Sequence, residues 1–484
     1  MKSQTIDLPS SMESQHGISE GGNGEHPPYA LAGIENEKKG EPERQDAFGD
    51  EEFAEVKYKV LKWWQCGLLM VAETISLGIL SLPAAISGLG VAPGIIILIG
   101  LGIVASYTGY ILGQFKLRHP HVSSIADAGE VILGPFGREI FFTGHMLYLV
   151  FIMSSHILTF TVAMNTITEH GTCSLVFGVV GTVISFFFAL PRTMKNMTWF
   201  SLASFISILT AVILTMIVLG VQNTAATFSV TKTATLANAV ISVCNIVFAY
   251  ASHNTFFNMM AELEDPREFP KALALLQAVN ISLYTIIALV VYRYAGDSVA
   301  SPALGSTGPL ISKIAYGIAL PTVITDRDSI ARMHVICTDN SRQIVIAGVI
   351  YGHVAVKTIY IRIFAGTERM HKRDFIAVGV WVGMGLAVWI SAWIIASAIP
   401  VFNNLLGLMS ALFASWFSFG VPAILWLHMN SGLWLSSPRK VALTGINFFI
   451  ICISMTLCGL GVYASGKAIH DSSASGSFSC ANNA

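Results

Sequence analysis

The sequence contains few charged residues for its length. Only 12% of its 484 residues are Asp, Glu, Lys or Arg, whereas soluble domains carry about 25%. Hydrophobic residues make up 53% and form many long runs of the kind that cross a lipid bilayer. The formal net charge of −1 argues against a nucleic-acid partner. This composition predicts a multi-pass membrane protein embedded in the lipid bilayer, rather than a set of soluble domains.

The sequence also lacks the motifs of several common enzyme classes. It contains neither a GxxxxGK[ST] loop nor an HExxH pair, and its seven cysteines form no CxxC pair. We therefore predict no enzyme activity, catalytic residue, cofactor or metal site. Most cysteines lie in apolar runs, where a buried apolar role is expected. Cys173 and Cys480 can both lie on the external side of the membrane, where they can form a disulfide or remain as two free thiols.

Residues 1–55 have no apolar periodicity and are rich in Glu, Gly, Ser and Pro. Such a segment cannot bury enough surface to fold alone, so we predict a disordered cytoplasmic tail. It is not a signal peptide, because it has no basic stretch followed by an apolar core. Solvation explains its charges, and the alternative is a partner-binding tail, with ubiquitin-dependent regulation through Lys2, Lys38 or Lys39. A transmembrane domain over 56–466 and a short tail over 467–484 complete the predicted organisation.

The apolar runs predict about eleven transmembrane helices in an all-α fold. A spanning helix needs roughly 20 mostly apolar residues. The candidate spans are 62–86, 91–115, 137–166, 173–190, 197–221, 236–260, 271–293, 309–364 with an interruption, 374–399, 401–428 and 441–464.

The loops between these spans predict an orientation. Lys and Arg are in excess on the cytoplasmic side of membrane proteins. If the N-terminus is cytoplasmic, the inner loops hold Lys57, Lys59, Lys62, Lys116, Arg118, Arg138, Arg192, Lys195, Arg267, Lys271, Lys357, Arg362, Arg369, Lys372, Arg373, Arg439 and Lys440. The outer side then holds only Lys232, Arg293, Lys313 and Lys467. This asymmetry supports a cytoplasmic N-terminus and an external C-terminus.

Two spans have the composition of interrupted helices. The first contains Gly78, Pro83, Gly88 and Gly90, and the sixth has a small, polar centre at 249–255. Interrupted helices at matching places in two halves indicate the binding site of a transporter. The two lie five spans apart, which fits two five-helix halves and one further helix. Glycine and proline are common in membrane helices without any such role, and that alternative remains open.

Free backbone groups at such breaks suit an amino acid, because amides hold a carboxylate and carbonyls hold an ammonium group. The predicted substrate-binding residues in the first span are Ser76, Leu77, Gly78, Ile79 and Leu80. Those in the sixth span are Phe248, Ala249, Tyr250, Ser252 and His253.

Glu73 is the one acidic residue deep inside a predicted span, and an intramembrane carboxylate is a functional hypothesis by default. We predict that it carries a coupling proton, and the alternative is a protonated residue that only packs helices together. His145, His156, His253 and His353 also lie in spans and can relay protons near neutral pH. Among them we favour His253 because it lies in the interrupted sixth span.

Four long motifs resemble the amino acid/auxin permease family, and within it the fungal neutral amino-acid permeases. They are LKWWQCGLLMVAETISLGILSLPAAISGLG, YILGQFKLRHPHVSSIADAGEVILGPFGRE, FAYASHNTFFNMMAELEDPREFPKAL and IVIAGVIYGHVAVKTIYIRIFAGTERMHKRD. The resemblance runs from about Tyr58 to the last span. It implies eleven helices, a five-plus-five inverted repeat of the leucine-transporter type with broken helices 1 and 6, and proton-driven amino-acid uptake. It also implies substrate at Ser76–Leu80 and Phe248–His253.

The eighth span is interrupted by Val323–Gln343, which contains Asp326, Arg327, Asp328, Arg332, Asp339 and Arg342. Each unpaired charge in the membrane costs at least roughly 2.5–3.5 kcal/mol, so one continuous helix cannot hold them. The family resemblance implies no insert here. We therefore hypothesise a translated intron, because Val codons begin with GT and Gln can be encoded by CAG. A genuine loop or re-entrant insertion is the alternative.

These observations predict a secondary active transporter of the plasma membrane. We expect symport of neutral, aliphatic or aromatic, amino acids with protons by alternating access. Sodium coupling, a vacuolar location and a transport-inactive amino-acid sensor remain as alternatives.

Overall fold

The computed structural model describes residues 59, 61–190, 197–222, 227–319, 347–364, 375–473 and 477–482. All of them belong to one compact unit, Arg44–Ala484. The predicted tail over 1–55 and the insert Val323–Gln343 lie outside the described residues. Within this part of the chain, secondary structure is almost entirely helical, apart from one isolated bridge between Leu61 and Leu263.

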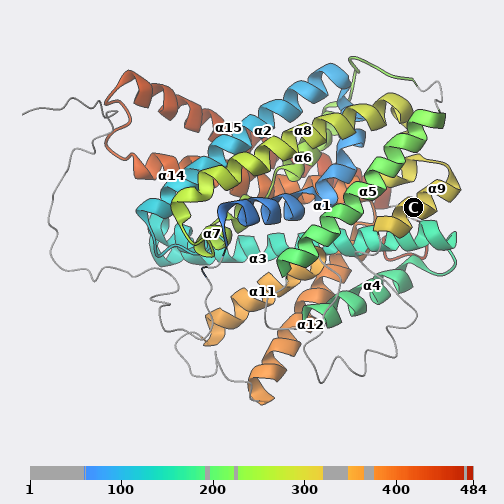
Figure 1. Cartoon of the computed structure of the whole chain (residues 1–484), viewed down its shortest axis with the longest axis horizontal. Coiled ribbons are helices and arrows are strands. Elements are labelled where there is room, and N and C mark those ends of the chain that lie inside the picture. The colour runs from blue at the N-terminus through green and yellow to red at the C-terminus, as the bar shows by residue number, and fades with distance from the viewer. Residues whose placement is uncertain are drawn as a thin grey trace, which may run out of the picture. The chain divides into compact units, whose positions relative to one another are not determined.

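The first five predicted spans each contain one helix (Figure 1). Their bounds are α1 Trp63–Leu89, α2 Val91–Arg118, α3 Ile125–Thr168, α4 Ser174–Ala189 and α5 Met197–Gln222. The sixth span is divided into α6 Leu236–Ala249 and α7 His253–Ala261. The seventh is α8 Phe269–Ala295, which follows η1 Pro266–Glu268.

The remaining spans are less regular. Short turns η2 Gly296–Ser298 and η3 Ala303–Ser306 lead to α9 Pro309–Ala319, and α11 Ala347–Phe364 follows the gap in the described residues. The ninth span is α12 Phe375–Ala398. The tenth combines α13 Phe402–Met409, the π-helical turns η6 Ser410–Ala414 and η7 Trp416–Gly420, and α14 Val421–Met429. The last is α15 Pro438–Ser473.

The span prediction agrees with these helices. Nine helices among the described residues are long and apolar enough to cross a membrane, and Ser174–Ala189 is a shorter apolar helix. The predicted eighth span corresponds to α9 and α11 on either side of the undescribed residues. A helix is therefore present in every predicted span.

Helices five spans apart pack against one another, as two structural repeats would. The pairs are α1 with α6, α2 with α8, α3 with α9 and α11, and α4 with α12 (Figure 1). Packing within the halves also corresponds, since α1 contacts α5 and α6 contacts α13. This arrangement confirms the predicted five-plus-five organisation with α15 as the additional helix.

The predicted break in the sixth span is present, whereas the one in the first span is not. Helix α6 ends at Ala249 and α7 begins at His253. Helix α1 runs unbroken from Trp63 to Leu89, with Pro83 inside it. The prediction of an interrupted first helix was therefore wrong for this structure.

Close packing explains the glycines of α1. A Cβ atom added at Gly78 would lie 2.8 Å from the Cα atom of Ala249, and one at Gly88 would lie 2.2 Å from Oγ of Ser242. Both contacts are to α6. The glycines therefore let two backbones approach each other, which is the other common use of glycine in membrane helices.

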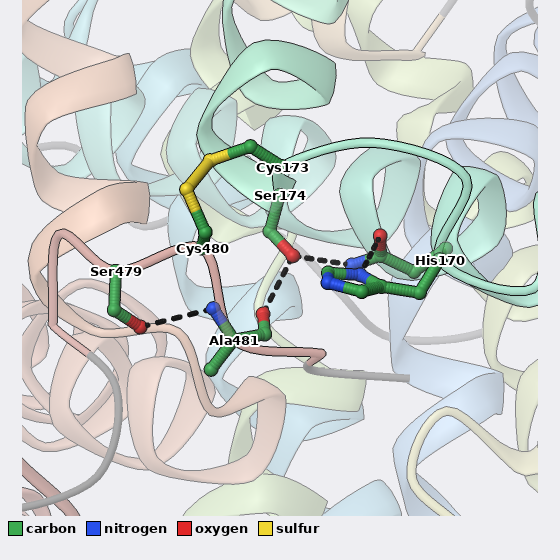
Figure 2. The surroundings of a disulfide bond; sticks show 7 residues. His170, Cys173, Ser174, Ser479, Cys480 and Ala481 are labelled. Carbon is green, nitrogen blue, oxygen red and sulfur yellow. Dashed lines mark hydrogen bonds between the residues drawn. A yellow bond between two sulfur atoms is a disulfide. The ribbon is translucent and has the colours of Figure 1, made fainter.

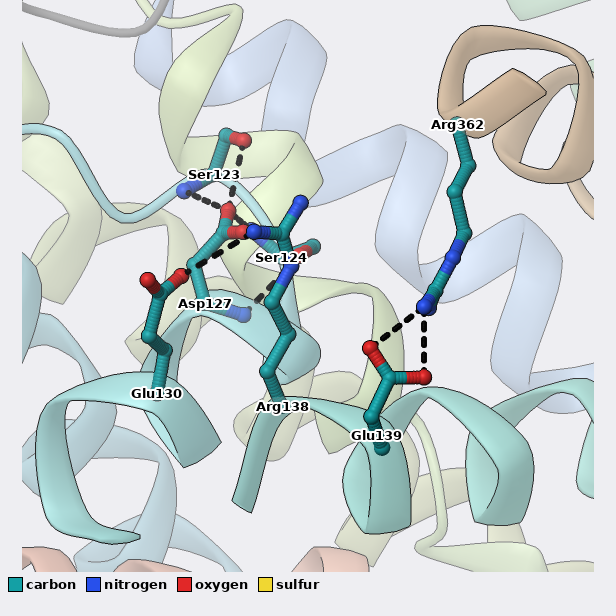
Figure 3. Close-up of polar contacts among 7 residues, drawn as sticks. All are labelled: Ser123, Ser124, Asp127, Glu130, Arg138, Glu139 and Arg362. Atoms are coloured by element: carbon teal, nitrogen blue, oxygen red, sulfur yellow. Dashed lines mark hydrogen bonds and ion pairs between the residues drawn. The ribbon is translucent and has the colours of Figure 1, made fainter. Parts of the chain in front are cut away.

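Helix α3 bends sharply near its start, at a point that requires glycine. Gly134 has φ +64° and ψ −153°, and Pro135 follows it. The short segment before the bend begins at a capping box in which Asp127 accepts hydrogen bonds from the amide groups of Ser123 and Ser124 (Figure 3). Beyond the bend, the main part of α3 begins.

Two ion pairs hold this bent region in place. Arg138 lies 3.5 Å from Glu130 across the bend, and Arg362 of α11 makes a two-oxygen contact with Glu139 of α3 (Figure 3). The guanidinium of Arg362 also lies 4.2 Å from the ring centroid of Phe142. These contacts join α3 to α11 near one end of both helices.

A disulfide joins Cys173 to Cys480 across 307 residues of sequence (Figure 2). Ser174 next to it donates a hydrogen bond to the carbonyl oxygen of Ala481 at 2.6 Å. The chain end is held further by the amide of Phe478, which donates to the carbonyl oxygen of Ser397 at 3.0 Å. The possible pairing of these two cysteines is thereby confirmed.

Candidate functional site

A small pocket lies beside the break between α6 and α7. It is lined by Glu73, Thr74, Ser76, Leu77, Tyr148, Ile152, His156, Phe248, Ala251, Ser252 and Tyr351. These residues come from α1, α3, the end of α6 with the break that follows it, and α11. The pocket therefore lies where the two halves of the chain meet.

Glu73 is the central polar group of this pocket. Its side chain is buried, and Thr255 Oγ1 in the first turn of α7 lies 3.2 Å from Glu73 Oε2. Tyr351 of α11 forms a second side-chain hydrogen bond with the same carboxyl group. Glu73 thus connects three helices, α1, α7 and α11.

Regular helical hydrogen bonds do not continue through the break, so some polar groups there bond to side chains of other helices and others have no partner among the described residues. The hydroxyl of Tyr148 on α3 donates to the carbonyl oxygen of Ala251 at 3.2 Å. Ser252 Oγ is buried, lines the pocket and has no hydrogen-bond partner. An unpaired hydroxyl in a buried site costs free energy unless a ligand or water satisfies it. Ser252 is therefore a strong candidate to contact a bound molecule.

The buried side chain of Tyr284 connects the end of α6, next to the break, to α1. The hydroxyl of Tyr284 on α8 lies 2.9 Å from the carbonyl oxygen of Ala249 and 3.2 Å from that of Thr74. One proton serves these two acceptors, one from α6 and one from α1. This contact fixes the end of α6 against α1 and positions the pocket between them.

Five predicted substrate or proton residues line the pocket. They are Glu73, Ser76, Leu77, Phe248 and Ser252. Because α1 is continuous, Ser76 and Leu77 contribute side chains here, and their amide groups lie within an intact helix. The predicted use of free backbone groups in the first span is therefore not supported by this structure.

The other predicted residues lie around the pocket without lining it. Gly78 packs on Ala249, and Ile79 and Leu80 are fully buried in the apolar core. The ring of Tyr250 lies 5.4 Å from that of Tyr284. These residues position the helices that form the pocket.

His253, the favoured histidine, points toward α2. Its Nε2 atom lies 3.0 Å from the carbonyl oxygen of Ala105 and 3.1 Å from Oγ1 of Thr108. It is fully buried and does not line the pocket. In this structure the contacts of His253 join the start of α7 to α2.

Sequence reasoning missed Thr74, Tyr148, Ile152 and Tyr351, and it named His156 only as one of four histidines that can relay protons. Tyr148, Ile152 and His156 lie on α3 at intervals of four, and Tyr351 lies on α11. Intervals of four place side chains on one helix face. The periodicity around His156 was therefore a usable signal, whereas nothing in the sequence indicated that this face meets Glu73.

The fold and the pocket define a multi-pass helical membrane protein with a polar site at a helix break. Residues 59–466 match the model of a family described as transmembrane amino acid transporter protein. The N amino acid transport system protein of Neurospora crassa is 35% identical over 442 residues, which cover 89% of this chain and 88% of that protein. The chain belongs to this amino acid transporter family, and the resemblance to amino acid/auxin permeases is confirmed.

Further similarities are more distant. A transmembrane transporter of Gibberella moniliformis is 27% identical over 443 residues, which cover 88% of this chain and 89% of that protein. Among solved structures, MhsT in complex with L-phenylalanine is similar at 12% identity and a TM-score of 0.48, over 85% of this chain and 100% of that chain. A Na+-coupled sialic acid symporter is similar at 14% identity and a TM-score of 0.44, over 84% of this chain and 90% of that chain.

Proposed function

We propose that this transporter is a proton-coupled symporter of neutral aliphatic or aromatic amino acids that works by alternating access. The observation that carries the proposal is the pocket beside the α6–α7 break. Among the described residues that line it, Glu73 is the single carboxylate and there is no Lys or Arg. The pocket thus combines one proton-binding group with polar atoms and apolar walls.

The pocket lining supports a neutral substrate. Leu77, Ile152 and Phe248 offer apolar surface for a side chain, and Ser252 offers a free hydroxyl for the zwitterionic end. A cationic or anionic substrate side chain would need a counter-charge, because a buried unpaired charge is costly. The described lining residues include no Lys or Arg that could pair with an acidic side chain.

The burial of Glu73 supports proton coupling. A charged side chain inside the membrane costs roughly 2.5–3.5 kcal/mol or more, so a carboxyl group there favours its neutral form unless it is paired. The two hydrogen bonds from Thr255 and Tyr351 stabilise the ionised form when the proton leaves. Both states of Glu73 are therefore accessible, as a proton carrier requires.

We further propose a plasma-membrane location with the N-terminus in the cytoplasm. The distribution of Lys and Arg between the loops supports this orientation. The Cys173–Cys480 disulfide supports it as well, because disulfides persist on the oxidising side of a membrane. Both cysteines then face the exterior, together with the end of α15.

Transport by the purified full chain in proteoliposomes tests the proposal. An inward proton gradient should drive uptake of labelled neutral amino acids, with about tenfold accumulation per pH unit for one coupled proton, since tenfold corresponds to about 1.4 kcal/mol. A protonophore should abolish accumulation. Uptake of labelled free lysine and glutamate measures transport of cationic and anionic amino acids. Uptake driven by a sodium gradient without a pH gradient measures sodium coupling.

The matched variants are Glu73→Gln and Glu264→Gln. Glutamine preserves the size and hydrogen bonding of Glu73 but carries no proton, so accumulation should be lost while exchange of substrate across the membrane persists. Glu264 is an exposed carboxylate beyond α7, and its replacement should change nothing. Uptake that follows sodium and ignores pH would reject proton coupling, and pH-driven accumulation by Glu73→Gln would reject Glu73 as the carrier.

A further inference from the structure

Basic side chains gather where α2 ends and where α14 is joined to α15. The group, called here the basic cluster, consists of Arg118, His119, His121, His428, Arg439 and Lys440. Arg118 is the last residue of α2, His428 lies in the last turn of α14, and Arg439 and Lys440 lie in the first turn of α15. The end of α2 and the junction of α14 with α15, which are far apart in the sequence, therefore bring basic side chains to one place.

These side chains influence one another electrostatically. The rings of His119 and His121 are 6.0 Å apart and meet edge to face. Burial lowers the pKa of His119, and electrostatic interactions with His121, His428 and Arg118 lower it further. Lys440 in turn lies within electrostatic range of Arg118 and Arg439. The cluster is thus a region of mutual repulsion.

No acidic residue in the described part of the chain neutralises this repulsion. None of the ion pairs between described residues involves a member of the cluster. The hydrogen bonds that Arg118 and Lys440 donate end on neutral acceptors, the carbonyl oxygen of Met429 at 2.9 Å and the side-chain oxygen of Asn430. An external anion would therefore be strongly favoured here.

An exposed apolar loop adjoins the basic cluster. Residues 430–437 connect α14 to α15, and Leu433, Trp434 and Leu435 are 52%, 38% and 80% exposed. The indole of Trp434 donates to the carbonyl oxygen of Leu427 at 3.0 Å, which fixes the ring at the helix end. Tryptophan beside basic residues at span ends is typical of the interface between lipid tails and headgroups.

We propose that the basic cluster binds the headgroup of an anionic phospholipid, with the Leu433–Leu435 loop among the adjoining acyl chains. Guanidinium and ammonium groups donate charge-assisted hydrogen bonds to phosphate oxygens. Basic pockets between helices on the cytoplasmic side are suited to such headgroups. Their position at the ends of three predicted spans places these donors at headgroup depth.

The bound lipid would join the end of α2 to the start of α15. These helices already meet further along, where Nδ2 of Asn447 donates to the hydroxyl oxygen of Tyr107 at 2.7 Å. Helix α2 also packs on α7 and α8, whose residues Thr255 and Tyr284 bond to Glu73 and Thr74 of the pocket lining. A lipid at the basic cluster would therefore stabilise the arrangement of helices around the pocket without touching the substrate.

Native mass spectrometry of the full chain in mixed micelles tests this inference. The probes are phosphatidylserine, a phosphatidylinositol phosphate, phosphatidylcholine and inorganic phosphate. The triple variant Arg118→Gln/Arg439→Gln/Lys440→Gln should bind the anionic lipids about 100-fold more weakly, at roughly fivefold for each charge near the surface. A control triple, Arg138→Gln/Arg267→Gln/Lys271→Gln, makes the same change in net charge and should bind them as the unaltered chain does.

A second measurement uses the unaltered protein alone. Its unfolding temperature should rise with either anionic lipid and should not respond to phosphatidylcholine or inorganic phosphate. Equal lipid binding by both triple variants would overturn the proposal. So would a rise with inorganic phosphate as large as that with lipid, because the occupant would then be a free anion.

Discussion

The hydroxyl oxygen of Thr255 lies 3.2 Å from Oε2 of Glu73 and 2.9 Å from the carbonyl oxygen of Ser252. A hydroxyl group has one proton and therefore donates fully to only one of these acceptors at a time. When Glu73 is protonated, it donates to Thr255, and Thr255 donates to Ser252. When Glu73 is ionised, Thr255 donates to Glu73 and the carbonyl group in the helix break is released.

The variant Thr255→Val tests whether this exchange links proton binding to the break. Valine has the shape of threonine but cannot donate a hydrogen bond. The ratio between the substrate affinities at low and high pH should therefore shrink by about two- to tenfold, the factor that corresponds to the free energy of one hydrogen bond. Thr255→Ser retains the hydroxyl and should preserve the pH profile. Substrate binding to the purified protein at several pH values measures both, and identical profiles for the valine and serine variants would contradict the linkage.

Ser252→Ala examines the unpaired hydroxyl in the pocket. If Ser252 Oγ contacts the charged end of the substrate, its removal should raise the Kd by about tenfold or more, because hydrogen bonds to charged groups contribute about 1.5–3 kcal/mol. Ser418→Ala is the control, since Ser418 Oγ is also buried without a partner but lies in η7 rather than in the pocket lining. Isothermal titration with a neutral amino acid provides the measurement, and equal affinity in both variants would exclude Ser252 as a contact.

Gly78→Ala tests the close packing of α1 on α6. The new Cβ atom would meet the Cα atom of Ala249 at 2.8 Å, and backbone cannot rotate away as a flexible side chain can. We expect a loss of about 1–3 kcal/mol in the free energy of unfolding, as overpacking typically causes. Gly100→Ala, where no atom lies within 4 Å of the added Cβ, should leave the unfolding temperature unchanged or slightly raised. Similar unfolding temperatures for both variants would show that α1 and α6 are not tightly packed there.

The Cys173–Cys480 disulfide gives a test of orientation as well as of stability. A membrane-impermeant maleimide applied to intact cells should label both thiols only after reduction, and Cys173→Ser/Cys480→Ser should not gain this label. Loss of the disulfide should also lower the unfolding temperature, since such a bond typically contributes about 2–4 kcal/mol. Cys452→Ser, which removes a free cysteine, should change neither result. Labelling that requires permeabilised cells would place this end of the chain inside.

Glu262 introduces a pH dependence of stability at the end of α7. Burial raises the pKa of Glu262, and the nearby Lys357 opposes the shift. The folded state therefore holds this proton more tightly than the unfolded state, and the resulting stabilisation is complete below the ordinary glutamate pKa. It is lost as the pH rises through the raised pKa of the folded state.

As the pH rises from the ordinary glutamate pKa through the raised pKa of the folded state, the unfolding temperature of the unaltered protein should fall relative to that of Glu262→Gln. The variant has no carboxyl proton to lose. Glu264→Gln removes the exposed neighbouring carboxylate and should follow the unaltered protein. Thermal unfolding in detergent at a series of pH values measures all three. Parallel curves for the unaltered protein and Glu262→Gln would refute the prediction.

Span positions and the break in the sixth helix could be predicted because both are local properties. A helix that spans the bilayer requires a long apolar run. The mostly small and polar residues at 249–255 interrupt such a run, which indicates a break in the helix. The glycines of the first span were ambiguous for a physical reason. Glycine both permits a break and permits close contact, and only the position of α6 against Gly78 distinguishes the two.

The sequence by itself determined the class of protein, the positions of the apolar spans and the presence of a carboxylate within the first one. Only the tertiary structure decided which groups that carboxylate meets. Tyr148, Thr255 and Tyr351 come from α3, α7 and α11, and their distance from Glu73 along the chain has no relation to their distance in space. Packing between helices, rather than any local pattern, brings these side chains together, because side-chain contacts across a fold depend on where whole helices lie.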